Sequence, residues 1–253
     1  MSGHSKWASI KHKKAATDAK RGKVFSTIVS ELVVAARAGG ADPDANPRLR
    51  MVLAKAKEAN MPADNIKRAI QRGTGELPGT ILEEITYEGY GPGGVAILVE
   101  AVTDNKNRTS SNVRHLFNKG GGNLGETGCV GWMFRKKGYL SLKEEEIGED
   151  EIFEIALEAG AEDVKTEEGV HEITTSISDF ENVKQAIEGR GLVFEVAEIT
   201  MLPATTVLLT GKEARQALRL VENLEEDDDI QQVYANFDIS SEDLKKWETG
   251  SGE

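Results

Sequence analysis

The residues of this sequence that are best suited to chemistry are a group of cations at its N-terminus. Up to residue 23 the chain carries seven lysines and arginines against a single acid, Asp18, and Trp7 lies among them. The cations are Lys6, Lys11, Lys13, Lys14, Lys20, Arg21 and Lys23. Clustered cations with an interleaved aromatic side chain are typical of a segment that binds a polyanion. The alternative is a solvated N-terminus whose lysines confer only solubility, and composition leaves both interpretations open.

Two helices predicted downstream add further outward cations. Asn46-Pro47 starts the first, because Asn is a good N-cap and Pro is tolerated at the first helical position; Met61-Pro62 opens the second. Their cations are Arg48, Arg50, Lys55, Lys57, Lys67, Arg68 and Arg72. On the first helix these side chains either cover the edges of the buried stripe or contact phosphate groups.

The charge of the chain is segregated. The overall net charge of −12 would by itself argue against a nucleic-acid partner. Residues 1–75, however, hold 15 Lys and Arg against 6 Asp and Glu, a net charge of +9, whereas residues 76–253 hold 16 against 37, a net charge of −21. A basic head on an acidic body concentrates the attraction for polyanions at one end of the molecule.

Other kinds of site find little support in the sequence. The histidines are scattered, none has a partner at metal-ligand spacing, and no carboxylate pair lies in an apolar run as acid–base catalysis would require. Cys129 is the only cysteine and is expected to be a buried thiol. The Gly-rich segment 119–125 follows a helix and lacks Gly-Lys-Ser/Thr, so we expect a structural loop. We therefore predict no enzymatic activity, no metal, no cofactor and no small-molecule substrate.

Two further polar segments have simple structural explanations. Residues 104–111 read Asp-Asn-Lys-Asn-Arg-Thr-Ser-Ser, which suits a helix-capping loop; an edge that faces RNA or protein is the alternative. The acidic run 225–229 is expected to be a solvated loop.

The hydrophobic periodicity predicts an α+β protein of several domains. Apolar residues recur at helical spacing over 23–37, and Gly39-Gly40 ends that helix. With the two helices after it, this predicts a basic helical domain over residues 1–78, whose third helix is ended by Gly73 and Gly75. After Gly79 the period changes to that of strands.

The remaining chain predicts two α/β domains. Strands around Ile85–Tyr87 and Val95–Ala101, a helix over 105–119 and a strand over 130–134 begin the first. A strand–helix–strand–strand–helix–strand series over 139–199 then matches the ferredoxin-like order. Its strands are expected at 139–142, 163–166, 171–175 and 193–199, and a strand, helix and strand follow at 205–209, 212–224 and 230–235.

We interpret the ferredoxin-like unit, 137–202, as an insertion into a discontinuous middle domain formed by residues 79–136 and 203–240. Residues 241–253 are expected to be a tail. A single cysteine precludes an internal disulfide, no apolar run is long enough to span a membrane, and the N-terminus has no signal-peptide core. These features predict a cytoplasmic protein with no membrane partner. They make no prediction of the oligomeric state.

Four motifs in this sequence resemble the YebC family of probable transcriptional regulatory proteins. They are Gly3-His4-Ser5-Lys6-Trp7, the segment 60–66 (Asn-Met-Pro-Ala-Asp-Asn-Ile), the segment 87–94 (Tyr-Glu-Gly-Tyr-Gly-Pro-Gly-Gly) and the segment 103–109 (Thr-Asp-Asn-Lys-Asn-Arg-Thr). The resemblance covers essentially the whole chain. It implies a helical N-terminal domain followed by two α/β domains.

The resemblance also implies a function in gene expression. Bacterial members are described as cytoplasmic DNA-binding regulators and have been linked to translation on the ribosome. A mitochondrial relative is described as a translational activator of a cytochrome oxidase subunit. We therefore expect a DNA-binding transcriptional regulator that uses the basic head. The alternatives are a translation factor that contacts ribosomal RNA or tRNA, with Trp7 and His4 stacking on bases, and a module that binds an acidic protein.

Overall fold

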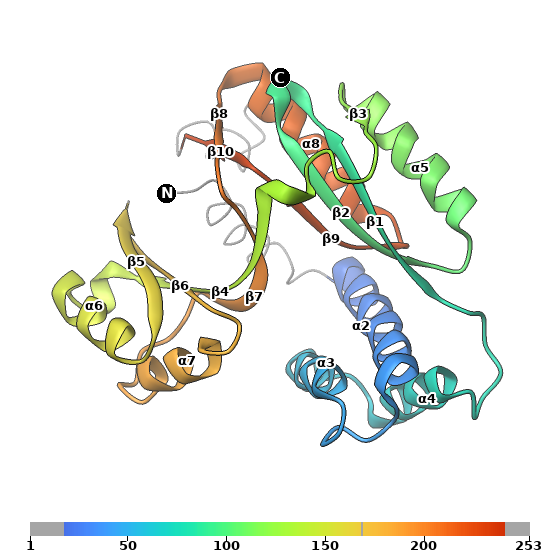
Figure 1. Cartoon of the computed structure of the whole chain (residues 1–253), viewed down its shortest axis with the longest axis horizontal. Coiled ribbons are helices and arrows are strands. Elements are labelled where there is room, and N and C mark those ends of the chain that lie inside the picture. The colour runs from blue at the N-terminus through green and yellow to red at the C-terminus, as the bar shows by residue number, and fades with distance from the viewer. Residues whose placement is uncertain (1–17, 168, 241–253) are drawn as a thin grey trace.

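The N-terminal domain is a set of three helices. The computed structural model of the protein describes residues 18–167 and 169–240. Its first helices are α2 (Asp18–Gly39), α3 (Pro47–Glu58) and α4 (Ala63–Thr74), and they lie together at one end of the molecule (Figure 1). Their buried stripes meet in one core that includes Leu32, Leu49 and Ala69. The predicted helical domain is therefore present.

The predicted cap of α3 is confirmed and has a second role. The Asn46 side-chain oxygen accepts from the backbone N–H of Leu49 at 3.0 Å, and its amide nitrogen donates to the Ala35 carbonyl of α2 at 2.8 Å. The prediction for Gly73 was wrong, because α4 continues to Thr74 and ends at Gly75, which has φ +83°. Gly73 instead lets α4 approach α2, since a Cβ there would meet the backbone of Val33.

The central sheet joins distant parts of the chain. Its strands are β1 (Glu83–Tyr90), β2 (Ala96–Thr103), β3 (Asn123–Leu124) and β9 (Ile230–Ala235), in the order β3-β1-β2-β9. The short turn η1 (Pro92–Gly94) joins β1 to β2. Helices α5 (Lys106–Lys119) and α8 (Gly211–Glu226) pack on one core with the sheet and lie beside it in Figure 1. The antiparallel pairing of β9 with β2 supports our proposal that 79–136 and 203–240 form one domain.

The strand expected at 205–209 does not extend this sheet. Residues Val207–Leu209 form β8, which pairs in parallel with β10 (Phe237–Ile239) in a separate two-stranded sheet. Leu209 and Ile239 are nevertheless buried in the same core as α8. The small sheet therefore closes one end of that core.

The ferredoxin-like unit is present with the predicted order of elements. They are β4 (Phe134–Lys143), η3 (Glu144–Glu146), α6 (Glu149–Glu158), β5 (Ala161–Glu167), β6 (Val170–Thr175), α7 (Phe180–Glu188) and β7 (Val196–Pro203). The strand order is β5-β6-β4-β7, and all neighbours are antiparallel. The last strand starts three residues later than predicted and extends to Pro203, because β4 is long and pairs with it from Phe134 to Ser141.

The strand predicted over 130–134 was wrong. Residues Gly131–Met133 form a short 3-10 turn, η2, and the strand β4 begins only at Phe134. A buried carboxylate causes the change, because Glu88 on β1 accepts the backbone N–H groups of Gly128, Val130 and Gly131. These donors converge on one side chain, which an extended strand cannot achieve, since its successive N–H groups alternate in direction.

Among the described residues, no helix has both the length and the apolar character needed to cross a membrane.

Candidate nucleic-acid interface

Part of the predicted interface lies outside the described residues. This applies to Lys6, Trp7, Lys11, Lys13 and Lys14. Lys20 and Arg21 belong to the first turn of α2, but only their backbone is described.

Lys23 ties the start of α2 to the acidic body. Its half-buried ammonium group donates to the backbone carbonyl of Asp227, in the loop between α8 and β9. Burial lowers the pKa of Lys23, and the carboxylates of Asp228 and Asp227 oppose that shift. The predicted solvated loop therefore includes a contact with the helical domain.

The cations of α3 are mostly engaged by other parts of the protein. Arg48 forms a two-point ion pair with Glu84 of β1, and Lys55 forms one with Glu31 of α2 at 3.1 Å. The hydrogen bond that Arg48 donates to Glu84 raises the pKa of Arg48. Arg50 donates to backbone carbonyls of the preceding turn at 3.1 and 3.0 Å. These contacts hold α3 in place, so its cations are less available to an added ligand.

The cations of α4 are differently placed. Lys67, Arg68 and Arg72 are exposed and make no ion pair with any other residue that the structure describes, and the same holds for Lys57 at the end of α3. Arg68 and Arg72 are four residues apart and therefore share one face of the helix. We define Lys67, Arg68 and Arg72 as the α4 cation face. Its three positive charges lie on one helix and are not neutralised by an ion pair with the described residues.

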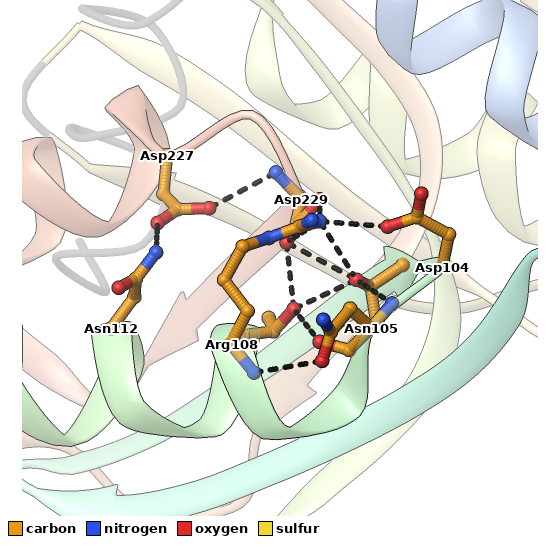
Figure 2. A network of polar contacts seen from close by, with 8 residues as sticks. Asp104, Asn105, Arg108, Asn112, Asp227 and Asp229 are labelled. Carbon is orange, nitrogen blue, oxygen red and sulfur yellow. Dashed lines mark hydrogen bonds and ion pairs between the residues drawn. The ribbon is translucent and has the colours of Figure 1, made fainter.

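A second polar cluster surrounds Asp229, at the start of β9 (Figure 2). Its carboxylate accepts from Thr109 at 2.6 Å and from Arg108 at 3.0 Å, and Arg108 also pairs with Asp104 at 2.9 Å. Burial favours the neutral acid, but hydrogen bonds from Thr109 and Arg108 hold the pKa of Asp229 below its ordinary value. The cluster joins the start of α5 to β9 and has a structural explanation.

The predicted capping role of segment 104–111 is confirmed. Asn105 caps α5, because its side-chain oxygen accepts from the backbone N–H of Arg108 at 3.1 Å. The acidic run 225–229 was interpreted too simply as a solvated loop, because Asp229 belongs to this network.

The Gly-rich segment is a structural loop, as predicted, but Cys129 is only half-buried and not the buried thiol that we expected. A Cβ at Gly122 would overlap the Tyr90 carbonyl, and one at Gly120 would overlap Leu220 of α8. Burial raises the pKa of the Cys129 thiol, which disfavours the nucleophilic thiolate. His171 is buried, with one ring nitrogen 2.8 Å from Thr166 Oγ1 and the other 2.9 Å from the Ile147 carbonyl. Within the described residues, no group of side chains is suited to hold a metal ion.

Sequence reasoning missed three residues that the structure makes prominent. Glu88 is buried yet holds a loop, Asp229 anchors a network, and Trp132 is 71% exposed. No local signal marked Glu88, because β1 carries three acids, Glu83, Glu84 and Glu88, and only the last is buried. The signal for Trp132 was an aromatic residue beside the basic run 135–137.

Comparisons with known proteins match nearly the whole chain. A family model described as the TACO1/YebC protein N-terminal domain matches residues 5–76, and one described as the TACO1/YebC second and third domain matches residues 82–237. A "Probable transcriptional regulatory protein" of Syntrophobacter fumaroxidans is 58% identical over 247 residues, which cover 97% of this chain and 99% of that protein. A protein of Geobacter sulfurreducens with the same description is 57% identical over 246 residues, with coverage of 97% and 99%.

A solved structure agrees with these matches. The crystal structure of a conserved hypothetical protein from Aquifex aeolicus is similar to this one, with a TM-score of 0.78 and 51% sequence identity. The similarity covers 92% of this chain and 96% of that one.

Proposed function

Because this chain belongs to the TACO1/YebC family, we propose that it regulates gene expression by binding nucleic acid through its basic N-terminal helical domain. Relatives named as probable transcriptional regulatory proteins support a regulatory role. DNA is the first target that we propose, and the cytoplasm is the proposed location.

The observation that carries the proposal is the segregation of charge. The net charge is +9 over residues 1–75 and −21 over residues 76–253. Lys and Arg that neutralise phosphates release counterions, which supplies affinity for any sequence. The α4 cation face suits this role, because its side chains are exposed and have no carboxylate partner among the described residues. The cations of α3 that already form ion pairs or hydrogen bonds within the protein would instead stabilise the helical domain.

The second candidate is a ribosome-associated translation factor that contacts ribosomal RNA or tRNA. The acidic body favours this candidate. Residues 76–253 have a net charge of −21 and therefore repel a DNA duplex, but they can contact protein on a ribosome. In this arrangement the basic head would reach RNA while the body contacts protein. Phosphate contacts support both candidates equally, because they carry no sequence information.

A binding titration of the full-length protein tests the proposal. The ligands are a random DNA duplex and purified ribosomes, each at several salt concentrations. A protein that makes several phosphate contacts loses roughly a thousandfold in affinity between about 50 and 200 mM salt. Reversal of the α4 cation face (Lys67→Glu, Arg68→Glu, Arg72→Glu) should abolish binding. The matched control reverses Arg114 and Lys119 on α5, which are also exposed.

The two ligands separate the two candidates. Tight duplex binding with a steep salt dependence supports a DNA-binding regulator. Ribosome binding without duplex binding at physiological salt supports the translation factor. If the α4 reversal and the α5 reversal leave binding to both ligands equally unchanged, the helical domain is not the nucleic-acid interface.

A further inference from the structure

The turn η2 presents an exposed tryptophan at the junction between the central sheet and the ferredoxin-like unit. It connects the segment after β3 to the start of β4, which runs from one domain into the other (Figure 1). Trp132 in this turn is 71% exposed, more than any other large apolar side chain that the structure describes. Indole is a large, mostly apolar group, so its exposure forgoes much of the gain that burial would give.

A hydrophobic cluster is formed by the residues on either side of Trp132, but Trp132 itself is not part of it. Val130 is fully buried and Phe134 is 6% exposed, both in a cluster with Leu98 and Tyr234. In an extended strand residues 130, 132 and 134 would share one face, because side chains alternate with a period of two. The 3-10 turn breaks that alternation. It buries the two flanking residues and turns the indole outward.

The turn is held in this shape by buried hydrogen bonds. Glu88 is 6% exposed and accepts the N–H groups of Gly128, Val130 and Gly131 at 2.8, 2.7 and 2.6 Å. The Cys129 carbonyl accepts from the indole Nε1 of Trp132 at 3.2 Å. The polar edge of the indole is therefore satisfied within the protein. The exposed part of the Trp132 side chain is therefore its apolar ring, and the turn that carries the ring is held in place by hydrogen bonds.

Two exposed cations follow the turn in an otherwise acidic body. Arg135 and Lys136 open β4 and make no ion pair with the part of the chain that the structure describes. The next residue, Lys137, is in contrast engaged by Glu162 at 2.6 Å. Because successive strand residues point to opposite faces, Arg135 and Lys136 lie on opposite faces of β4. The hydrogen bond from Arg48 is the main cause that lowers the pKa of Glu84, and the charge of Lys136 adds to it. Both cations follow Trp132 closely in the chain, at three and four residues from it.

We propose that Trp132, Arg135 and Lys136 form a second nucleic-acid contact, specific for unpaired nucleotides. One base stacks on the exposed indole, and the neighbouring phosphates are bound by Arg135 and Lys136. Aromatic rings bind unpaired bases in this way with little sequence preference, since every base has a π face. A paired base is stacked within its helix and cannot reach the ring. The inference deepens the proposed function and rests on it, because it names the kind of nucleic acid that reaches the body.

Binding of a single-stranded RNA to the full-length protein tests this contact. The probe is an oligouridylate of about 12 nucleotides, with a DNA oligomer of the same sequence class and a duplex RNA as comparisons. Trp132→Ala should weaken oligouridylate binding roughly tenfold and duplex binding less than about twofold. Trp132→Phe should retain most of the affinity, whereas Trp132→Leu, which is apolar but has no ring, should lose it. Phe153→Ala removes an exposed aromatic of α6 and is the matched control.

Two further readouts separate stacking from a loss of fold. In the variant Trp7→Phe, Trp247→Phe the only remaining tryptophan is Trp132, and oligouridylate should quench its fluorescence. Arg135→Ala and Lys136→Ala should each lower the slope of log affinity against log salt by about one. Equal quenching by duplex and single strand would contradict a preference for unpaired bases.

The outcomes distinguish this inference from the proposed function. Unchanged oligouridylate affinity in Trp132→Ala, or no oligouridylate binding at low salt, overturns the inference whatever the head binds. Insensitivity of duplex and ribosome binding to the α4 reversal overturns the proposed function whatever Trp132 does. A loss in Phe153→Ala equal to that in Trp132→Ala would assign the effect to general surface change and overturn the inference.

Discussion

The helical domain and the central sheet use charge in opposite ways. On α4 the cations Lys67, Arg68 and Arg72 face solvent and make no ion pair with the described residues. In the central sheet the notable charges are two carboxylates, Glu88 and Asp229, that face inward and accept several hydrogen bonds each. Fully satisfied buried carboxylates fix loops, whereas exposed uncommitted cations contribute little to stability. The inward-facing carboxylates therefore serve the fold, and the exposed cations of α4 are available for the nucleic-acid binding that we propose.

The largest effect should come from Glu88. Glu88→Ala leaves three backbone N–H groups without their acceptor, so we expect a loss of about 3 kcal/mol in the free energy of unfolding. Chemical denaturation measures it. The control is Glu84→Gln on the same strand, which removes only an exposed ion pair with Arg48 and should cost less than about 1 kcal/mol. Similar losses in the two variants would remove the distinction between the buried and the exposed carboxylate.

The second effect concerns binding and separates α4 from α3. Alanine at Lys67, Arg68 and Arg72 should lower the salt slope for a nucleic-acid ligand by about three and the affinity by roughly a hundredfold. Alanine at Arg48 and Lys55 should change the slope far less, because their charges are already matched by Glu84 and Glu31. Titrations at several salt concentrations measure both. Equal slopes for the two variants would show that the ion pairs of α3 open on binding.

A smaller effect is expected at Asp229. Asp229→Asn removes the ion pair with Arg108 and weakens the hydrogen bond from Thr109, so stability should fall by about 1–2 kcal/mol. The neighbouring Asp228→Asn is the matched control, since that side chain is exposed, and it should change stability by less than about 0.5 kcal/mol. Thermal and denaturant unfolding of both variants check this ranking.

The smallest effect should be the dependence of stability on pH that Glu88 causes. Burial favours the neutral acid, but the three N–H donors hold the pKa of Glu88 below the ordinary value for a glutamate side chain. A carboxyl group with a depressed folded-state pKa contributes its full stability above the unfolded pKa and loses it as pH falls through the folded pKa. Unfolding measured from about pH 6 to pH 3 should therefore show a steeper decline for the wild type than for Glu88→Gln. Parallel curves would contradict this.

Much of the architecture could be predicted from the sequence. The α3 cap at Asn46, the capping role of Asn105 and the ferredoxin-like order are confirmed, because each depends on local periodicity or on side-chain contacts within a few residues. The family resemblance suggested by four motifs is also confirmed. The boundaries of β7 and the ends of α4 were less accurate, since strand pairing and helix packing extend or shorten elements beyond their local pattern.

The candidate site was only partly predictable. Fifteen candidate residues could be named from the sequence, but they could not be ranked, because the partner of a cation is often distant in the chain. Glu84 engages Arg48 across 36 positions, and Asp227 engages Lys23 across 204. Among the described residues of the predicted interface, the α4 cation face and Lys57 are exposed and make no ion pair. The nucleic-acid role of every candidate stays a prediction.

By itself, the sequence determined the helices, the order of elements along the ferredoxin-like unit and the division into a basic head and an acidic body. These follow from periodicity, caps and charge, which are properties of neighbouring residues. Only the tertiary structure decided which charged side chains form ion pairs or hydrogen bonds within the protein and that the Trp132 side chain faces solvent. Glu88 reaches the turn η2 from a strand about 40 residues earlier, and its hydrogen bonds override the local preference for a strand. Long-range contacts of this kind leave no periodic trace, so they are set only when the chain folds.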